Sequence, residues 1–166
     1  MRKTAYLSLG SNVGARNVNL EMAISRLEEL GRVTAVSAFY ESEPVENRDQ
    51  PWFLNCVVAL QTDLMPRQLM SHILEIESEM GRRRSQSPPK GPRTIDIDVL
   101  LFANSVIDTA ELTVPHPAMH QRRFVLEPLT EIAPDVLHPV LKKTARQLRD
   151  ALPRNEQKVR KLAGRS

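Results

Sequence analysis

The stretch Ile95-Asp-Ile-Asp-Val-Leu-Leu-Phe102 is the most strand-like segment of the 166-residue chain. Successive side chains of a β-strand point to opposite faces of the sheet. We therefore expect the apolar residues at positions 95, 97, 99 and 101 to point into the core. Asp96 and Asp98 would then share the opposite face, with Cα atoms ~6.5–7 Å apart.

The residues before this strand predict the rest of a sheet. Strands are expected at 4–9, 33–40 and 53–61, which are rich in β-branched and other apolar residues. Amphipathic helices are expected at 17–30 and 66–80, where apolar residues recur at helical spacing before a glycine ends the pattern. The order β-α-β-β-α-β predicts an α+β fold, a ferredoxin-like antiparallel sheet with both helices on one face.

The residues after this strand predict a helical C-terminal extension. A small hairpin is expected between residues 106 and 114, followed by short helices at 117–131 and 144–152. No repeat or linker divides the chain, so we expect a single domain over 1–166, with 152–166 as a basic tail.

Charge is distributed unevenly along the chain, whose formal net charge is +3. Residues 142–166 carry nine Lys or Arg and two acidic residues, so the preceding part of the chain is net acidic. A basic terminus can contact nucleic acid or a membrane surface, but a solvated terminus without a partner is the interpretation we favour. Polar, proline-containing loops are expected at 41–51 and 82–92. Residues 82–93 contain five basic residues and no acidic residue, which predicts an anion nearby.

Composition and apolar patterning are those of a soluble globular protein. Hydrophobic residues make up 41% of the chain and charged residues 26%, which is ordinary for this class. The first apolar stretch ends at Gly10, too early for a signal peptide, and no other run approaches a membrane span. The single cysteine, Cys56, cannot form an internal disulfide and suits a reducing compartment. We expect a cytoplasmic protein.

The paired aspartates predict a metal site. Two carboxylates on one face of a strand repel each other unless a cation lies between them. Mg²⁺ prefers oxygen ligands and completes its shell with water and substrate phosphates, and carboxylate-bridged ion pairs recur in phosphoryl-type displacement. The motif Asp-x-Asp is weak by itself, so an amphipathic strand with two solvated acids stays open as an alternative.

An arginine next to the aspartates, and the absence of the known phosphate-binding loops, make the prediction of a phosphate site more specific. Gly91-Pro92-Arg93 leads directly into the strand and places a guanidinium, a bidentate phosphate ligand, at its start. The chain contains neither GxxxxGK[ST] nor GxGxxG. The sequence therefore predicts a phosphate-transfer site in which side chains and metal hold the phosphates.

Two other segments contain candidate binding residues. His116 lies between two prolines and close in sequence to arginines such as Arg122, which favours phosphate binding over a purely structural role. No second histidine has the spacing of a metal ligand. Asn55 is polar within an apolar strand, and its donor and acceptor match the edge of a heterocycle on which Phe53 would stack. On that segment alone, ordinary core packing is the favoured interpretation.

In their order along the chain, these segments resemble the 6-hydroxymethyl-7,8-dihydropterin pyrophosphokinase family. The matching segments are Leu9-Gly10-Ser11-Asn12, Phe39-Tyr40, Asp49-Gln50-Pro51, Leu54-Asn55, Gly91-Pro-Arg-Thr-Ile-Asp-Ile-Asp98, Leu112-Thr-Val-Pro-His116 and Glu131-Ile-Ala-Pro134. The pattern GPRxxDxD followed by LTVPH is highly specific, and the resemblance extends to about residue 150. It implies transfer of the β,γ-diphosphate of ATP to the pterin hydroxymethyl oxygen, with release of AMP, in folate biosynthesis.

The resemblance also implies roles for individual residues. The catalytic residues would be Arg82, Arg93, Asp96 and Asp98, with the two aspartates binding two Mg²⁺ ions. The nucleotide site would be lined by Glu77, Arg82, Arg84, Arg93, Val99, Leu112, Thr113, His116 and Arg122, with Val99 and Leu112 at the adenine. The pterin would stack between Phe53 and Phe124, with Pro44, Val45, Asn55 and Asp96 around its edge. We expect small-molecule substrates only, no nucleic acid or membrane partner, and a monomer.

Two rival functions remain at this stage. A two-metal nucleotidyl transferase on the same kind of sheet would release pyrophosphate from ATP in place of AMP. An RNA-binding sheet would need exposed aromatic residues on its strands, but aromatic residues make up only 4% of this chain. Among departures from the family pattern, Glu111 stands where an arginine can occur, which removes a possible phosphate contact.

Overall fold

The structure is a computed structural model that describes residues 2–44, 49–81, 94–154 and 157–162. Its strands and helices, in chain order, are β1 (Lys3–Ser11), α1 (Arg16–Leu27), β2 (Arg32–Val36), β3 (Tyr40–Ser42), β4 (Phe53–Thr62), α2 (Pro66–Glu79), β5 (Asp96–Phe102), β6 (Ile107–Asp108), β7 (Thr113–Val114), the 3₁₀ turn η1 (Met119–Gln121), α3 (Arg123–Ile132), α4 (Ala145–Asp150) and β8 (Val159–Lys161). No helix in these ranges is long and apolar enough to cross a bilayer.

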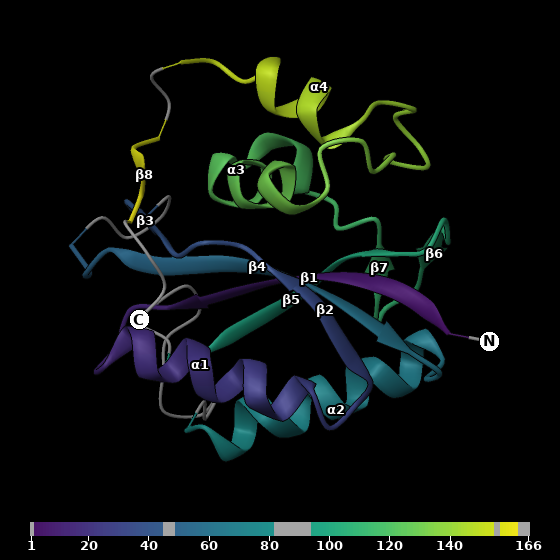
Figure 1. Ribbon diagram of the computed structural model, residues 1–166, viewed down its shortest axis with the longest axis horizontal. Coiled ribbons are helices and arrows are strands. Elements are labelled where there is room, and N and C mark those ends of the chain that lie inside the picture. The colour runs from purple at the N-terminus through teal and green to yellow at the C-terminus, as the bar shows by residue number, and fades with distance from the viewer. Residues whose placement is uncertain (1, 45–48, 82–93, 155–156, 163–166) are drawn as a thin grey trace.

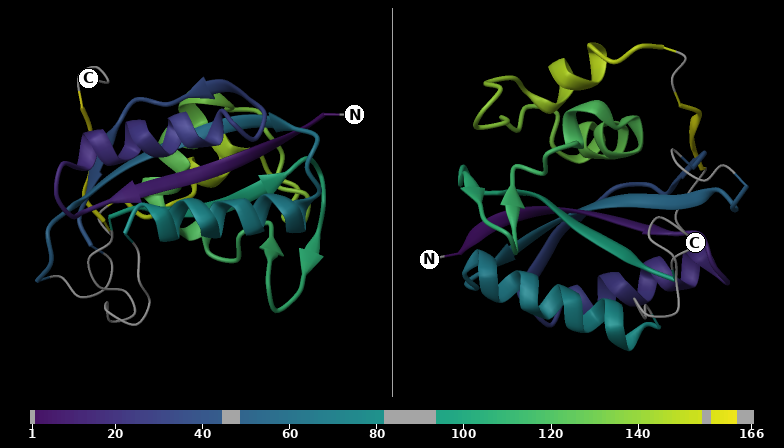
Figure 2. Two further views of the ribbon diagram at one scale, coloured as in Figure 1. Left: turned by 90° about the horizontal axis from the view of Figure 1, so that it is seen from below. Right: turned by 180° about the vertical axis from the view of Figure 1, so that it is seen from behind.

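An antiparallel sheet runs through the middle of the molecule. Its strands are ordered β5-β1-β4-β3-β8, and β2 pairs with β4 beside β3. Helices α1 and α2 cover one face, and α3 and α4 lie over the other (Figure 1; Figure 2 shows the same layers from two further directions). The expected α+β class is confirmed, and the C-terminal helices cover the sheet face that α1 and α2 leave open.

Each sheet face has its own apolar cluster. The cluster beneath α1 and α2 contains Leu7, Leu9 and Ile97 from the strands. The cluster beneath α3 and α4 contains Val57 from β4 and Leu126 from α3. Because the central strands are buried on both faces, the sheet is a rigid platform for any side chain that projects from its strand ends.

A β-bulge interrupts the pairing of β1 with β5. Tyr6 lies opposite Leu101 and Leu7 opposite Val99, so Leu100 is an extra residue. The prediction that residue 101 shares a core with Val99 is wrong, because the bulge turns Leu101 into the cluster beneath α3, beside Leu100.

Two strands differ from the predicted pattern. The strand expected at 33–40 is divided into β2 and β3. At the break, Ser37 exchanges hydrogen bonds with Val57, its N–H donating to the Val57 carbonyl and its Oγ accepting from the Val57 N–H. Strand β8, which was not predicted, lies in the expected basic tail and pairs with β3. β3 extends to Ser42, inside the loop expected at 41–51, and the helix expected at 117–131 consists of the 3₁₀ turn η1 followed by α3. The other expected elements are present, with bounds that differ by up to three residues.

Candidate active site

Asp96 and Asp98 lie at the start of β5, on the sheet face that α3 covers. Asp98 lies opposite Ser8 of β1, which lies opposite Val57 of β4, and residues directly opposite in antiparallel strands share a face. Val57 belongs to the cluster beneath α3, which fixes the face. Both aspartates are half-buried, and neither contributes to an apolar cluster.

Gly10 leaves space beside Asp96. One row of cross-strand neighbours runs Asp96, Gly10, Asn55 and Tyr40, from β5 to β3. A Cβ at position 10 would lie 2.9 Å from Asn55 Nδ2 and 3.5 Å from Phe53 Cδ1. The missing side chain therefore lets the Asn55 amide and the Phe53 ring extend over β1 toward the aspartates.

Asn55 is buried and held by a hydrogen bond. It is 3% exposed, and Ser42 Oγ donates to its Oδ1. This bond directs Oδ1 toward β3, which leaves the two N–H donors of Nδ2 on the side of Gly10. Phe53, two residues earlier on the same face, is half-buried. Together they present an amide edge and an aromatic ring on one surface.

Phe124 and Arg122 approach this face from above. Phe124 lies in the first turn of α3 and packs against the cluster beneath that helix. The Arg122 guanidinium lies 5.5 Å from the centroid of the Phe124 ring, a cation–π contact. Pro44 is buried next to the end of β3. The structure thus places Phe124 on the same side of the sheet as Phe53 and Asn55.

His116 is fixed by the bulge in β5. Its backbone N–H donates to the Leu100 carbonyl at 2.9 Å, after a cis peptide bond between Val114 and Pro115. Its Nδ1 accepts from the Ala118 N–H at 3.1 Å, which leaves the neutral ring with its proton on Nε2.

The electrostatics of His116 connect it to its charged neighbours. Burial, and next the positive charge of Arg122, lower the pKa of His116 to about 4, against an opposing effect of the Asp96 carboxylate. His116 therefore lies within range of the charges of Arg122 and of Asp96, and it is a neutral hydrogen-bond donor at pH 7. Such a donor, beside an arginine, suits a phosphate oxygen.

Glu77 braces the strand that carries the aspartates. It is 4% exposed on α2, and its Oε2 accepts a hydrogen bond from the Ile97 N–H at 2.8 Å. Ile97 lies between Asp96 and Asp98, at an edge of the sheet. The buried carboxylate therefore satisfies an edge N–H that would otherwise have no ladder partner.

Leu112 lines a groove of about 680 Å³ between α2 and the β6–β7 hairpin. Met70 and Leu74 of α2 form its other apolar wall. Arg67 Nε and Glu111 Oε2, both exposed, form an ion pair at 3.3 Å that joins the two walls. The groove is wide and apolar enough for a flat heterocycle.

The remaining candidates of the nucleotide and pterin sites include residues that the structure describes and residues that it does not. Thr113 is half-buried in β7, next to the groove residue Leu112, whereas Val99 is 5% exposed and belongs to the core beneath it. Val45, Arg82, Arg84 and Arg93 lie outside the described residues. The roles predicted for those four stay predictions.

The carboxylates offer an incomplete shell for a metal ion. No group of three or more His, Cys, Asp or Glu within the described ranges is arranged to hold a metal. Two half-exposed carboxylates fit Mg²⁺ well, since that ion keeps water and takes substrate phosphate oxygens as further ligands.

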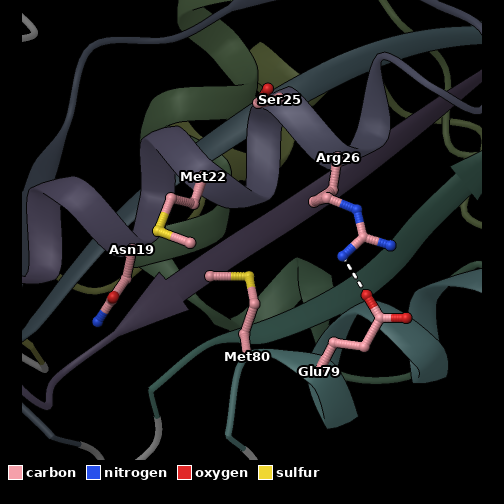
Figure 3. Close-up of a pocket in the computed structure, with 6 residues that line it drawn as sticks. All are labelled: Asn19, Met22, Ser25, Arg26, Glu79 and Met80. Carbon is pink, nitrogen blue, oxygen red and sulfur yellow. Dashed lines mark hydrogen bonds and ion pairs between the residues drawn. The ribbon is translucent and has the colours of Figure 1, made fainter.

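A second cavity, of about 410 Å³, lies between α1 and α2 and contains none of the candidate residues. Figure 3 shows Met22 and Met80 facing each other there, with Arg26 paired to Glu79 beside them. This cavity is a gap between two surface helices, and its lining residues all belong to α1, to α2 or to the residue after α2, so it is not part of the candidate site.

Sequence reasoning missed four residues of this arrangement. Gly10 and Ser42 shape the surroundings of Asn55, and Met70 and Leu74 line the groove opposite Leu112. The period of the α2 pattern marks positions 70 and 74 as members of one helix face but does not show that they border a groove. Ser42 gave no signal, because its role depends on the register of β3 against β4.

Comparison with known proteins identifies relatives along most of the chain. The family model described as 7,8-dihydro-6-hydroxymethylpterin-pyrophosphokinase (HPPK) matches residues 6–134. The 2-amino-4-hydroxy-6-hydroxymethyldihydropteridine pyrophosphokinase of Bacillus subtilis is 45% identical over 138 residues, which are 82% of this chain and 81% of that protein.

Other relatives are longer. The folic acid synthesis protein fol1 of Schizosaccharomyces pombe is 40% identical over 91% of this chain, but the match spans only 21% of its own length. A crystal structure of Plasmodium falciparum HPPK-DHPS superposes with a TM-score of 0.71 at 19% identity, covering 90% of this chain and 45% of that one. The chain thus spans about a fifth of the first relative and somewhat less than half of the second.

Proposed function

Because this chain belongs to the 7,8-dihydro-6-hydroxymethylpterin-pyrophosphokinase family, we propose that it transfers the diphosphate of ATP to 6-hydroxymethyl-7,8-dihydropterin and releases AMP. This reaction is a step of folate biosynthesis. The supporting observation is the row of cross-strand neighbours in which Asp96 and Asn55 flank Gly10, so that an acidic site and a heterocycle-binding surface adjoin.

The acceptor would bind over Gly10. Its ring would stack between Phe53 and Phe124, while the Nδ2 donors of Asn55 meet an acceptor atom at the ring edge. The hydroxymethyl group would then point along the row toward Asp96. Pro44, and Val45 by resemblance, would border the ring on the side of β3.

The nucleotide would bind on the opposite side of the aspartates. Its base would enter the groove lined by Leu112, with Val99 as part of the floor and Thr113 and Glu77 nearby. Neutral His116 and Arg122 would bind phosphate oxygens. By resemblance, Arg82, Arg84 and Arg93 would complete the phosphate site.

The transfer is a displacement at phosphorus. The hydroxymethyl oxygen attacks the β-phosphorus of ATP, and the bond from that phosphorus to the oxygen bridging it to the α-phosphorus breaks. The bridging oxygen leaves with AMP, and the hydroxyl proton passes to water. Asp96 orients the attacking hydroxyl, and the arginines bind the charged oxygens as the bonds change, since such reactions depend chiefly on alignment and electrostatic stabilisation.

Asp96 and Asp98 would hold Mg²⁺, and we propose two ions. When bound, magnesium neutralises the phosphate charge that otherwise repels the attacking oxygen. The two aspartates provide carboxylate oxygens on one face at neighbouring positions of a strand, the donor chemistry that this ion prefers.

Further proposals concern the whole chain. The sheet order β5-β1-β4 with β2 and β3 beyond β4 supports the ferredoxin-like assignment, extended by α3 and α4. We also propose a single-domain, monomeric, cytoplasmic enzyme that acts on small molecules alone.

The products of the reaction test this function. Incubation with ATP, Mg²⁺ and the reduced hydroxymethylpterin should yield AMP and the pterin diphosphate in equal amounts. Release of pyrophosphate would indicate nucleotidyl transfer, and formation of ADP would indicate an ordinary kinase. Omission of either the pterin or the magnesium is the control.

A further inference from the structure

The C-terminal segment, residues 157–162, lies along the outer edge of β3. We propose that this segment is a positioning element for the acceptor site, an inference that rests on the proposed function. The family model matches residues 6–134 and does not reach it. The sequence favours a solvated tail here. The structure instead shows an edge strand, β8, with hydrogen bonds to the chain on either side of β3 at both of its ends.

Backbone pairing fixes the segment to β3. Tyr40, Glu41 and Ser42 lie opposite Lys161, Arg160 and Val159. The Leu162 N–H donates to the Phe39 carbonyl at 2.9 Å, which extends the pairing beyond β3 at one end.

Glu43 closes the other end of the pairing. Its N–H donates to the Lys158 carbonyl at 3.1 Å, and its Oε1 accepts from the Lys158 N–H at 2.9 Å. Gln157 Nε2 donates to the Glu43 carbonyl at 2.8 Å. The residue directly after β3 is therefore held by backbone and side-chain hydrogen bonds from the C-terminal segment.

Two basic side chains of the segment form ion pairs with acidic residues of β3 and α3. Arg160 pairs with Glu41, whose other oxygen binds Arg16 of α1 at 2.8 Å. Lys161 Nζ lies 3.5 Å from Glu131 Oε1, the oxygen that also accepts from Tyr40 Oη. Arg160 and Lys161 thus have partners within the protein.

The connection to the acceptor site passes through Ser42. Strand β3 is only three residues long and lies between β4 and β8. Ser42 donates to Asn55 Oδ1 and so determines which way the Asn55 amide faces. If β8 were detached, β3 would become a short edge strand, and the Ser42 hydroxyl would lose its fixed position.

Arg160→Pro is a variant that separates strand pairing from charge. The Leu162 N–H points to β3, so the N–H of residue 160, two positions earlier, points there too. Proline removes this donor from the middle of the ladder. Arg160→Ala is the matched control, because it removes the ion pair with Glu41 and keeps the backbone N–H.

We expect Arg160→Pro to raise KM for the pterin about 5- to 10-fold, the effect of weakening one orienting hydrogen bond. KM for ATP should change less than about twofold, and Arg160→Ala should resemble the parent protein. The dissociation constant of the pterin, measured with a nonhydrolysable ATP analogue bound, should rise by the same factor as its KM.

Ser42→Ala provides a second route to the same result. It should raise KM for the pterin by a similar factor without detaching β8. Combining Ser42→Ala with Arg160→Pro should give no larger effect than the stronger single change, since both act through the Asn55 amide. If Arg160→Pro fails to fold, Lys158→Pro removes only the N–H that donates to Glu43 Oε1 at the end of the pairing. It should also raise KM for the pterin, and an unchanged KM in that variant would count equally against the inference.

Three results would overturn the inference. One is an unchanged pterin KM in folded Arg160→Pro, and another is an equal rise in KM for both substrates, as general loosening would give. The third is full additivity of the two changes. Failure of the proposed function is distinguishable from all three, because the parent protein would then form no AMP.

Discussion

Gly10 is the residue at which the two halves of the proposed site meet. An added Cβ there would lie 2.9 Å from Asn55 Nδ2, closer than such atoms approach in folded proteins, so the amide would have to move. We expect Gly10→Ala to raise KM for the pterin about tenfold, equivalent to one displaced hydrogen bond. KM for ATP should change little, because the groove beside Leu112 lies at the other side of the aspartates. Equal effects on both substrates would contradict this placement.

We expect the two aspartates to be needed for chemistry and not for folding. They are half-buried and lie outside both apolar clusters. We expect Asp96→Ala or Asp98→Ala to lower kcat by about a thousandfold or more, because each removes charge stabilisation at the reacting phosphate. AMP formation and thermal unfolding measure the two properties separately.

Asp108→Ala is the matched control for these variants, since Asp108 is an exposed acid on β6. It should leave both activity and the unfolding temperature unchanged. Retained activity in the Asp96 or Asp98 variant, or unfolding of either one, would contradict the assigned roles.

His116 should remain neutral over the physiological range. Its pKa in the folded protein is lowered to about 4, chiefly by burial. The unfolded chain has the ordinary pKa of about 6.5 and binds the proton first as pH falls. The free energy of unfolding should therefore be unaffected by this group above about pH 6.5 and should decrease as pH falls from there toward 4.

The measurement is the free energy of unfolding against pH for the parent and for His116→Gln, which lacks this titration. The parent should lose more stability than the variant between pH 6.5 and 4. Parallel curves, or a His116 ring that titrates near pH 6.5 by NMR, would contradict the assigned pKa.

At the scale of elements, the hydrogen bond from the Ile97 N–H of β5 to the Glu77 carboxylate of α2 connects the helix to the strand that contains the aspartates. Replacement of Glu77 by Leu should leave the Ile97 N–H without a partner and lower the free energy of unfolding by about 1–3 kcal/mol. Glu77→Gln keeps an acceptor oxygen and should retain most of that stability. Denaturant unfolding of the two variants measures the difference, and equal loss in both would show that charge, and not the hydrogen bond, is what matters.

Most elements could be predicted from sequence because their apolar residues follow one period. Helices α1 and α2 and strand β1 have that regularity, and β4 is a nearly continuous apolar run of the kind that predicts a strand buried on both faces. The division of β2 from β3 was not predicted, because the two weak strand formers Ser37 and Ala38 do not by themselves mark a break inside a β-rich stretch. The bulge at Leu100 lies in an unbroken apolar run, where alternation gives no register. Strand β8 is too short to show a pattern and is stabilised by pairing with β3.

Several residues of the candidate site, but not their arrangement, could be named from the sequence. The aspartates, Asn55, Phe53 and His116 are polar or aromatic residues in positions that predict a function. Their proximity depends on strand register and on the bulge that anchors His116, and both arise from tertiary packing. The contribution of Ser42 could not be predicted from its residue type, because Ser42 acts only through the Asn55 side chain that tertiary packing brings beside it.

At the scale of the molecule, helices on both faces make the sheet rigid and confine the chemistry to one end of its strands. Asp96, Asp98 and Asn55 lie on the face that α3 covers, and His116, which we propose binds phosphate together with Arg122, lies within range of the Asp96 charge. Arg160 and Lys161 of the C-terminal segment pair with Glu41 of β3 and Glu131 of α3, away from the aspartates of β5.

The most direct test is a crystal structure with a nonhydrolysable ATP analogue, Mg²⁺ and the pterin bound together. We predict magnesium on the carboxylate oxygens of Asp96 and Asp98, in contact with the β- and γ-phosphates, and the pterin stacked over Gly10 with its edge at Asn55. Carboxylates without metal, in crystals where nucleotide and pterin occupy other surfaces, would contradict the account.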